Sequence, residues 1–355
     1  MPRYGLFLLA ALLSLSLVVT GCTAPAETPA APESPAGPAE VPAPNLEQAP
    51  PVAPVAAPAA PQPGPGTDVG GGRLYFRLWG TTPDLMYLVP VTVEAPHPED
   101  MPQQALELLL TWPDKSGATV SLWPAGTKAD LRIQDGTATV DFTSLDTTKF
   151  GSTREAWALD GLTLTLTQFP LIKRVQIKVK GRVVETLAGH VETRRPLTPP
   201  PAVNRVAFSG TPAAGAGTMP VTLYFPGPQS LFLVPITRDV PKTPAVARTV
   251  VEELIRGPEK DSGLGRVIPE GTRLRGIKLQ DGLLTVDFSR ELRDKHWGGS
   301  AGERLTIEAI VHSLGAVPGV KQVEILIEGQ RGATIGGHVI LDRPTTPGPL
   351  NILGS

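Results

Sequence analysis

The residue with the most distinctive chemistry in this 355-residue chain is its single cysteine, Cys22. Cys22 follows a long apolar run and ends the segment Val18-Val-Thr-Gly-Cys22. A thiolate is nucleophilic enough at neutral pH to be alkylated. One cysteine alone forms neither an intramolecular disulfide nor a cysteine-based metal cluster. The chemistry that this position favours is covalent attachment of a lipid.

The residues ahead of Cys22 have the layout of an export signal. Arg3 supplies a positive charge, residues 5–19 are almost entirely apolar, and small residues precede the cysteine, as in a cleaved secretory signal. The segment resembles the bacterial lipobox, and its apolar run is shorter than the ~20 residues of a membrane-spanning helix. We therefore expect a signal peptide at residues 1–21 and a lipid anchor at Cys22 on the extracytoplasmic face of the cell membrane, rather than an uncleaved transmembrane anchor.

Histidines are the next candidates for chemistry, as metal ligands. His190 and His338 occupy the same place in two similar stretches of the chain, each beside glycine. Neither has a His, Cys or carboxylate next to it at ligand spacing, so we expect a structural loop and no metal. His312 falls among the apolar positions of a predicted helix, which indicates a residue of the core or its edge.

Asp141 and Asp287 are the acids most easily mistaken for catalysts, because both recur in the tripeptide Val-Asp-Phe. On a strand whose apolar residues alternate, each aspartate points away from the core, and we expect it to cap a turn or pair with a nearby amide. No second acid stands at a fixed local spacing to complete a general acid–base pair. Phosphate-binding glycine loops are also missing from the sequence. The sequence therefore predicts no enzyme, no cofactor, and no catalytic or metal site.

Charge is distributed unevenly along the chain. The net charge is -2, but residues 23–72 contain no Lys or Arg, and residues 73–355 carry 31 basic and 29 acidic residues. A nearly neutral body lacks the dense basic surface that nucleic acid binding requires. Residues 22–72 are rich in Pro and Ala, a composition that favours an extended linker. Fully extended, this linker would reach on the order of 150 Å. Whether it is a spacer of selected length or a plain leader stays open.

Everything after the linker occurs twice, 145 to 149 residues apart. An offset this constant over a whole domain length indicates tandem duplication. The paired motifs are Leu74-Tyr75-Phe76 with Leu223-Tyr224-Phe225, Tyr87-Leu-Val-Pro90 with Phe232-Leu-Val-Pro235, Gln134-Asp-Gly136 with Gln280-Asp-Gly282, Val140-Asp-Phe142 with Val286-Asp-Phe288, and Gly189-His190 with Gly337-His338.

Hydrophobic periodicity gives the order β-β-α-β-β-α-β for each repeat. In the second repeat the predicted strands are 221–225, 231–240, 274–279, 283–288 and 322–328, and the predicted helices are 244–256 and 302–314. Such an order fits an α+β domain with a mostly antiparallel sheet and two helices on one face. Residues 161–168 alternate like a strand, but they align with the second helix of the other repeat, so we expect a helix there.

The two repeats resemble GerMN domains of sporulation and spore germination proteins. The resemblance lies in Val221-Thr-Leu-Tyr-Phe225, Leu233-Val-Pro-Ile-Thr-Arg238, Glu253-Leu-Ile-Arg-Gly-Pro258, Ile268-Pro-Glu-Gly-Thr272, Thr285-Val-Asp-Phe-Ser289 and Glu328-Gly329. The first repeat departs from it, with Trp112-Pro113 in place of Gly257-Pro258 and Thr92-Val93 in place of Thr237-Arg238. It is open whether both repeats bind the same partner.

The resemblance implies a binding or scaffold lipoprotein with a protein partner in an envelope or sporulation complex. It leaves an oligomer or ring open, because GerMN domains are similar to ring-building modules. The alternative is a peptidoglycan-binding accessory or a subunit of a wall-modifying enzyme. We expect domains at residues 73–198 and 219–347, an inter-domain linker at 199–218, and a tail at 348–355. Prolines between the domains stiffen the join, so we expect a modest interface and one elongated unit.

Overall fold

The computed structural model describes residues 74–95, 98–208 and 217–353. All of these belong to one compact unit, Pro54–Ser355. The predicted signal peptide, Cys22 and the Pro/Ala-rich linker lie outside the described residues. The structure therefore bears on the two repeats and on the segment that joins them.

The first repeat has the predicted order of strands and helices. Its elements are β1 (Tyr75–Thr81), β2 (Leu88–Glu94), a 3-10 turn (Pro98–Asp100), α1 (Met101–Thr111), β3 (Lys128–Gln134), β4 (Thr137–Ser144), a second 3-10 turn (Thr147–Lys149), α2 (Ser152–Thr167), β5 (Arg174–Val179) and β6 (Arg182–Val183).

The second repeat has the same order of main strands and helices but no counterpart of β6, and a short strand, β7 (Arg205–Val206), precedes it. Its elements are β8 (Thr218–Pro226), a 3-10 turn (Pro228–Ser230), β9 (Leu233–Pro241), α3 (Val246–Arg256), β10 (Leu274–Gln280), β11 (Leu283–Phe288), α4 (Glu291–Asp294), α5 (Gly299–Gly315) and β12 (Gln322–Ile327). The predicted helix and strand boundaries agree with these to within three residues.

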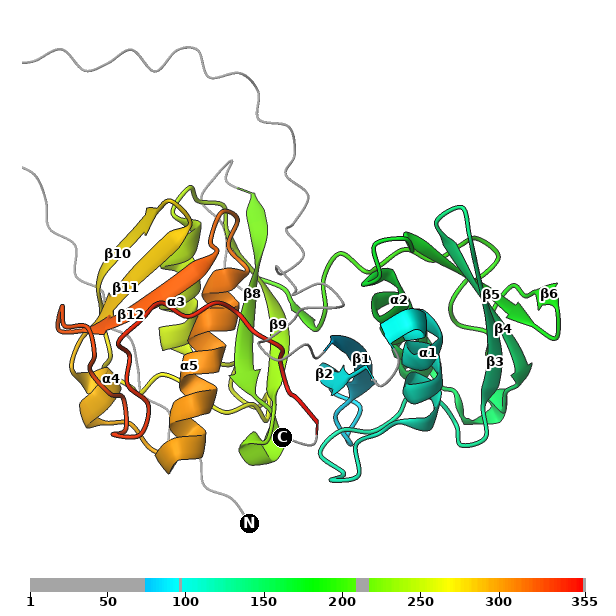
Figure 1. Cartoon of the computed structure of the whole chain (residues 1–355), viewed down its shortest axis with the longest axis horizontal. Helices are drawn as coiled ribbons and strands as arrows, with labels where there is room; N and C mark the ends of the chain where they lie inside the picture. Colours follow the sequence, from blue (N-terminus) through cyan, green and yellow to red (C-terminus); the bar gives the residue numbers. More distant parts are fainter. Residues whose placement is uncertain (1–73, 96–97, 209–216, 354–355) are drawn as a thin grey trace, which may run out of the picture. The chain divides into compact units, whose positions relative to one another are not determined.

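Each repeat is an α+β domain in which two helices lie between two groups of strands (Figure 1). On one side of α1 and α2 is the antiparallel hairpin β1–β2, and on the other is the sheet β3-β4-β5-β6. The second repeat places α3 and α5 between β8–β9 and β10-β11-β12 in the same way. The expected sheet is thus divided in two, and it is mixed because β4–β5 and β11–β12 are parallel.

The helix expected at residues 161–168 is confirmed, since α2 runs from Ser152 to Thr167. Its alternating leucines read as a strand in isolation, but Leu162 and Leu166 are four residues apart and both are fully buried. Of the two threonines between them, Thr163 bonds within the helix, where its Oγ1 donates to the Leu159 carbonyl at 2.7 Å. Burial of one helical face has outweighed local strand propensity here.

The pairing of the first strands corrects one part of the sequence alignment. Trp79 lies opposite Pro90, and Tyr224 lies opposite Pro235. The backbone N–H of Trp79 donates to Thr165 Oγ1 at 3.3 Å, and that of Tyr224 donates to Ser313 Oγ at 3.0 Å. Tyr224 therefore corresponds to Trp79, and the alignment of Tyr224 with Tyr75 was wrong by four residues. The sequence alignment had matched the two similar Leu-Tyr-Phe triplets, but strand pairing gives a different correspondence.

The two repeats fill the space beside the first strand differently. In the second repeat the ring of Phe225 packs under the buried guanidinium of Arg238, with 5.8 Å between the guanidinium carbon and the ring centroid. In the first repeat the position of Phe225 is held by Gly80. A Cβ placed there would come within 2.2 Å of the Trp112 indole. Trp112 corresponds to Gly257. The large side chain that fills this space therefore comes from strand β8 in the second repeat and from the end of helix α1 in the first.

Candidate functional site at the junction of the two repeats

The repeated aspartates cap turns, as the sequence predicted. Asp141 Oδ1 accepts from the backbone N–H of Gly181 at 2.9 Å, and Asp287 Oδ1 accepts from that of Gly329 at 2.8 Å. Both glycines follow the last long strand of their repeat and have positive φ values. This use of the carboxylates is structural, because each satisfies the backbone of a turn. An acid does lie near each of them: Asp130 is opposite Asp141 on β3, and Glu328 shares Arg275 with Asp287.

A repeated buried glutamate that the sequence analysis missed holds the glycine–histidine loop. Glu155, at the start of α2, accepts backbone N–H groups from Leu187, Ala188 and His190 at 2.9–3.0 Å. Glu303, at the same place in α5, accepts from Ile335 and His338. The two carboxyl-bearing residues are fully buried and 148 residues apart, an offset that sequence comparison could have found.

The two loop histidines differ in their contacts. His338 Nδ1 lies 3.2 Å from Glu303 Oε2, whereas His190 meets Glu155 only through its backbone N–H. Within the part of the chain that the structure describes, no group of three His, Cys, Asp or Glu side chains could hold a metal ion. The carboxylates near these histidines are the loop-binding glutamates. They lie far from the loops in sequence, which is why local spacing did not reveal them.

Two asparagines join the repeats, each by bonding to the backbone of both. Asn204 accepts from the Leu88 N–H and donates to the carbonyls of Leu88 and Pro235, all at 2.8 Å. Asn351 accepts from the Leu233 N–H and donates to the carbonyls of Leu233 and Pro90 at 2.7–2.8 Å. Asn204 bonds to Leu88 of the first repeat and Pro235 of the second, and Asn351 bonds to their counterparts, Leu233 of the second repeat and Pro90 of the first. The junction therefore has an internal two-fold pattern.

The segments around these asparagines exchange strands between the repeats. β7, which follows the first repeat, pairs in parallel with β9 of the second. Ile352, which follows the second repeat, forms a parallel bridge to Thr92 in β2 of the first. Residues 199–206 and 350–353, expected as linker and tail, thus belong to the junction. The prediction that the repeats touch is confirmed by these contacts.

A buried polar cluster also crosses the junction. Burial lowers the pKa of Arg77 in β1 to about 10 and raises that of Tyr224 in β8 to about 12. Burial, together with the nearby charge of Arg77, lowers the pKa of His312 in α5 to about 4, so its imidazole is neutral at pH 7. The rings of Tyr224 and His312 lie 5.4 Å apart. The expectation that His312 is a core residue is confirmed.

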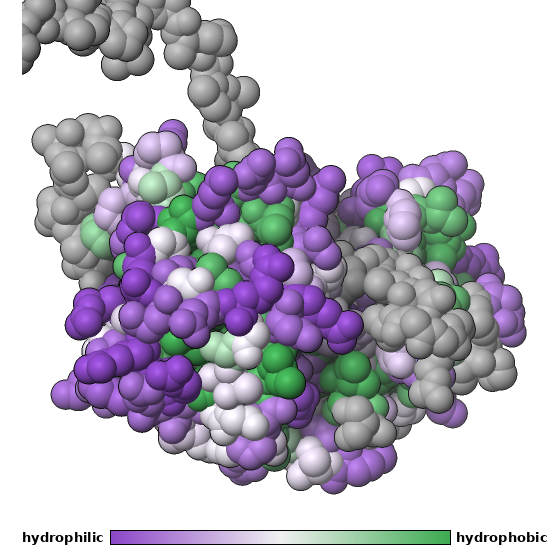
Figure 2. Space-filling model, turned by 60° about the vertical axis from the view of Figure 1, so that its left-hand side comes forward, coloured by the Kyte–Doolittle hydropathy of each residue, from purple (hydrophilic) through white to green (hydrophobic). Residues whose placement is uncertain are grey.

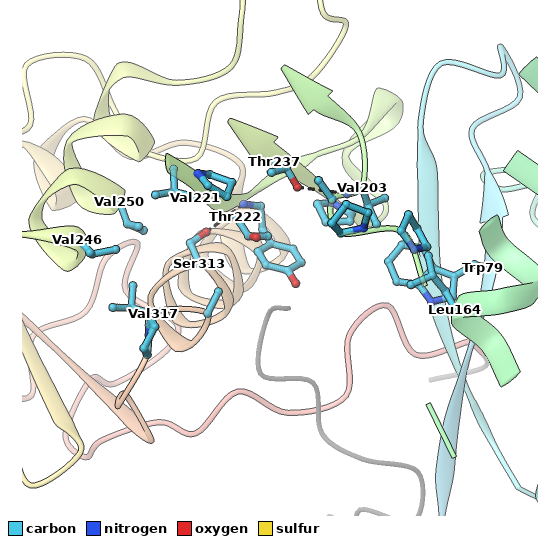
Figure 3. Close-up of a pocket in the computed structure, with 18 residues that line it drawn as sticks. Trp79, Leu164, Val203, Val221, Thr222, Thr237, Val246, Val250, Ser313 and Val317 are labelled. Carbon is cyan, nitrogen blue, oxygen red and sulfur yellow. Dashed lines mark hydrogen bonds between the residues drawn. The ribbon is translucent and has the colours of Figure 1, made fainter. Parts of the chain in front are cut away.

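A cavity of about 90 Å³ lies beside this cluster (Figure 3). Trp79 and Leu164 of the first repeat line one side, and Thr222, Val246, Val250, Ser313 and Val317 of the second line the other. The walls are mostly apolar, as in typical ligand sites. On the outer face drawn in Figure 2, hydrophilic residues predominate and hydrophobic ones form small separate patches. None of the described helices is long and apolar enough to span a membrane.

Comparison with known proteins agrees with the geometry of the repeats. The model of the family Germane, described as sporulation and spore germination, matches residues 73–185 and 222–333. The spore germination protein GerM of Bacillus subtilis is 28% identical over 265 residues, which are 69% of each chain. The solved tandem GerMN domains of GerM from Bacillus subtilis superpose with a TM-score of 0.61 at 24% identity, covering 80% of this chain and all of theirs.

Proposed function

The chain belongs to the Germane family of sporulation and spore germination domains, and from this membership we propose that it is a lipid-anchored binding protein of the bacterial envelope. Cys22 carries the anchor on the outer face of the cytoplasmic membrane. The two repeats bind a protein partner there as one unit, within an assembly that serves sporulation or germination.

The anchor is supported by the order of segments at the start of the chain. A basic residue, an apolar run and the segment Val18-Val-Thr-Gly-Cys22 are followed by 50 residues rich in Pro and Ala. Lipidated cysteine followed by an extended linker lets a folded unit stand away from the headgroups. This order, ahead of two Germane repeats, is the observation that carries the proposal.

A binding role is supported by how the repeated acids are used. Asp141, Asp287, Glu155 and Glu303 each accept backbone N–H groups of their own repeat. Their carboxylates hold turns and loops, so their repetition is explained by the fold. The junction joins the repeats into one surface, and a composite surface suits a protein partner.

The anchor is tested by growing cells that express the chain with an alkyne-bearing fatty acid. The label should follow the wild-type protein and be lost in Cys22→Ala, because the thiol is the only lipid acceptor of this type. Thr23→Ala is the control and should keep the label. A Cys22→Ala protein that still carries the label, or a mature chain that begins elsewhere than Cys22, would show that the proposal is wrong.

A further inference from the structure

In the first repeat, a side-chain amide covers the free edge of the first strand. Gln168, at the end of α2, accepts from the Arg77 N–H at 2.8 Å, and its Nε2 donates to the Arg77 carbonyl at 2.7 Å. These are the two bonds that a neighbouring strand would make to one residue of β1. The carboxamide of Gln168 therefore stands in for a peptide group of a third strand.

In the second repeat the corresponding amide is missing. Strand register equates Thr222 with Arg77, and the helix offset equates Ala316 with Gln168. Thr222 lies opposite Thr237, whose N–H points away from β8 to the Val203 carbonyl. In such a pair the N–H and C=O of Thr222 also point outward. Among the described residues, none bonds to these two groups on that side.

The open edge faces the cavity at the junction. Thr222 and Ala316 both line it, and the side chains of Val246, Val250 and Val317 form its apolar wall (Figure 3). Residues two apart on a strand direct their carbonyls to the same side, so the Pro220 carbonyl adds a third polar group along the edge. Backbone groups beside an apolar wall are what a strand-adding peptide requires.

We propose that the β8 edge at Thr222 binds an extended peptide segment of a partner protein, which supplies to the second repeat the amide that Gln168 supplies to the first. The inference rests on the proposed binding function and names the chemistry of the partner. Main-chain bonds to Thr222 hold the segment, and one small apolar side chain enters the cavity of about 90 Å³. The first repeat, whose edge is already covered, does not bind a peptide in this way.

The test uses the full chain in detergent micelles and a dye-labelled, end-blocked peptide of sequence Thr-Val-Ala-Val-Thr. Binding is followed by fluorescence anisotropy. The wild-type chain should bind the peptide and should bind it at least about tenfold more weakly when the central amide is N-methylated, because a donor to the Thr222 carbonyl is lost. Equal binding of both peptides would overturn the inference.

Two variants at one position provide the matched control on the protein. Ala316→Gln introduces the residue found in the first repeat and should weaken binding at least about tenfold by closing the edge. Ala316→Ser is small, leaves the edge open and should bind like the wild type. The melting temperature of each variant shows whether it is folded. If Ala316→Gln is unfolded, Ala316→Ser and the N-methylated peptide still decide the question.

N-acetylglucosamine is the competing ligand, because it also carries an amide. If it binds to the wild type and the peptide does not, the site is a sugar site and the inference is wrong. If no peptide binds to the wild type, the inference fails as well. Neither result affects the fatty-acid labelling of Cys22, so failure of this inference is distinguishable from failure of the proposed anchor.

Discussion

The region around Gly80 in the first repeat and the region around Phe225 in the second solve one packing problem in two ways. The second repeat uses a phenyl ring on the strand, with the Arg238–Glu253 ion pair above it at 2.7 Å. The first repeat has Val93 and Leu108 at the positions of that ion pair and fills the space with Trp112. Strand register is kept while side chains exchange places, so the fold depends on total volume rather than on particular residues.

The largest expected effect on stability comes from the buried glutamate that both repeats share. Glu155→Ala and Glu303→Ala should each lower the free energy of unfolding by about 3–4 kcal/mol, because each leaves buried backbone donors without an acceptor. Urea titration measures this. His190→Ala should change stability by no more than ~0.5 kcal/mol, since the described contact of His190 with Glu155 uses its backbone N–H. A cost under ~1 kcal/mol in either glutamate variant would contradict the account.

Arg238→Val should cost about 3 kcal/mol, because it leaves Glu253 without its mostly buried partner. The double variant Arg238→Val, Glu253→Leu copies Val93 and Leu108 of the first repeat. We expect the double variant to be more stable than Arg238→Val alone. In the single variant Glu253 keeps only the half-exposed Arg256 as a partner, at 3.2 Å, and the double variant replaces this mostly buried carboxylate with an apolar side chain. Chemical denaturation of the two single variants and the double completes the cycle. If the stability cost of the double variant equals the sum of the two single costs, the residues of the first repeat cannot replace the ion pair of the second.

Gly80→Phe should destabilise the first repeat by about 2–3 kcal/mol through overpacking, since even a Cβ at Gly80 meets the Trp112 indole. Adding Trp112→Gly copies the arrangement of the second repeat. It should recover part of the stability, because the indole is removed and glycine adopts the φ of 52° at position 112 without strain. The Val120 carbonyl, 2.8 Å from a Cβ at Gly80, still opposes full recovery. Thermal unfolding of both variants measures the recovery. If the double variant is no more stable than Gly80→Phe, the proposed exchange of volumes is incorrect.

The smallest expected effect is on pH dependence, where His312 corresponds to Leu164 of the first repeat. The folded-state pKa of His312 is about 4, below the ordinary 6.5. As pH falls below 6.5, the unfolded chain therefore binds a proton that the folded chain does not, and stability falls. Between pH 7 and pH 5 the wild type should lose about 2 kcal/mol more than His312→Leu.

Comparing the two proteins at each pH isolates His312, because burial raises the pKa of Asp160 to about 6 and also raises that of Glu308. Those carboxyl groups shift stability in the opposite direction over the same range. They are present in both proteins, so their effect cancels in the difference. Parallel stability curves for wild type and His312→Leu would show that the imidazole is not kept neutral in the fold.

Sequence periodicity and the repeat together predicted the strands and helices, because each is set by burial of one face. The repeat also predicted the helix at residues 161–168 against its own alternation. Contact between the repeats was predicted, but the bonds that build the junction were not. Asn204 and Asn351 lie in proline-rich segments assigned to a linker and a tail, and their bonds join strands over 100 residues distant. Only their similar spacing was visible in the sequence, nine residues after Arg195 and eight after Arg343.

The open edge at Thr222 was beyond sequence reasoning for a related reason. Its recognition needs the strand register that equates Thr222 with Arg77, and letter matching had placed Tyr224 four residues away from its true counterpart, Trp79. Gln168 and Ala316 align in the sequence, but the difference between them has meaning only once the strand edge beside them is known.

The two repeats form one unit through the exchanged segments at Asn204 and Asn351. Differential scanning calorimetry of the chain tests it most directly. The wild-type chain should show a single unfolding transition whose calorimetric and van't Hoff enthalpies agree. The double variant Asn204→Ala, Asn351→Ala should show two separate transitions, because the shared backbone bonds are lost. Two transitions in the wild-type chain would contradict the single unit.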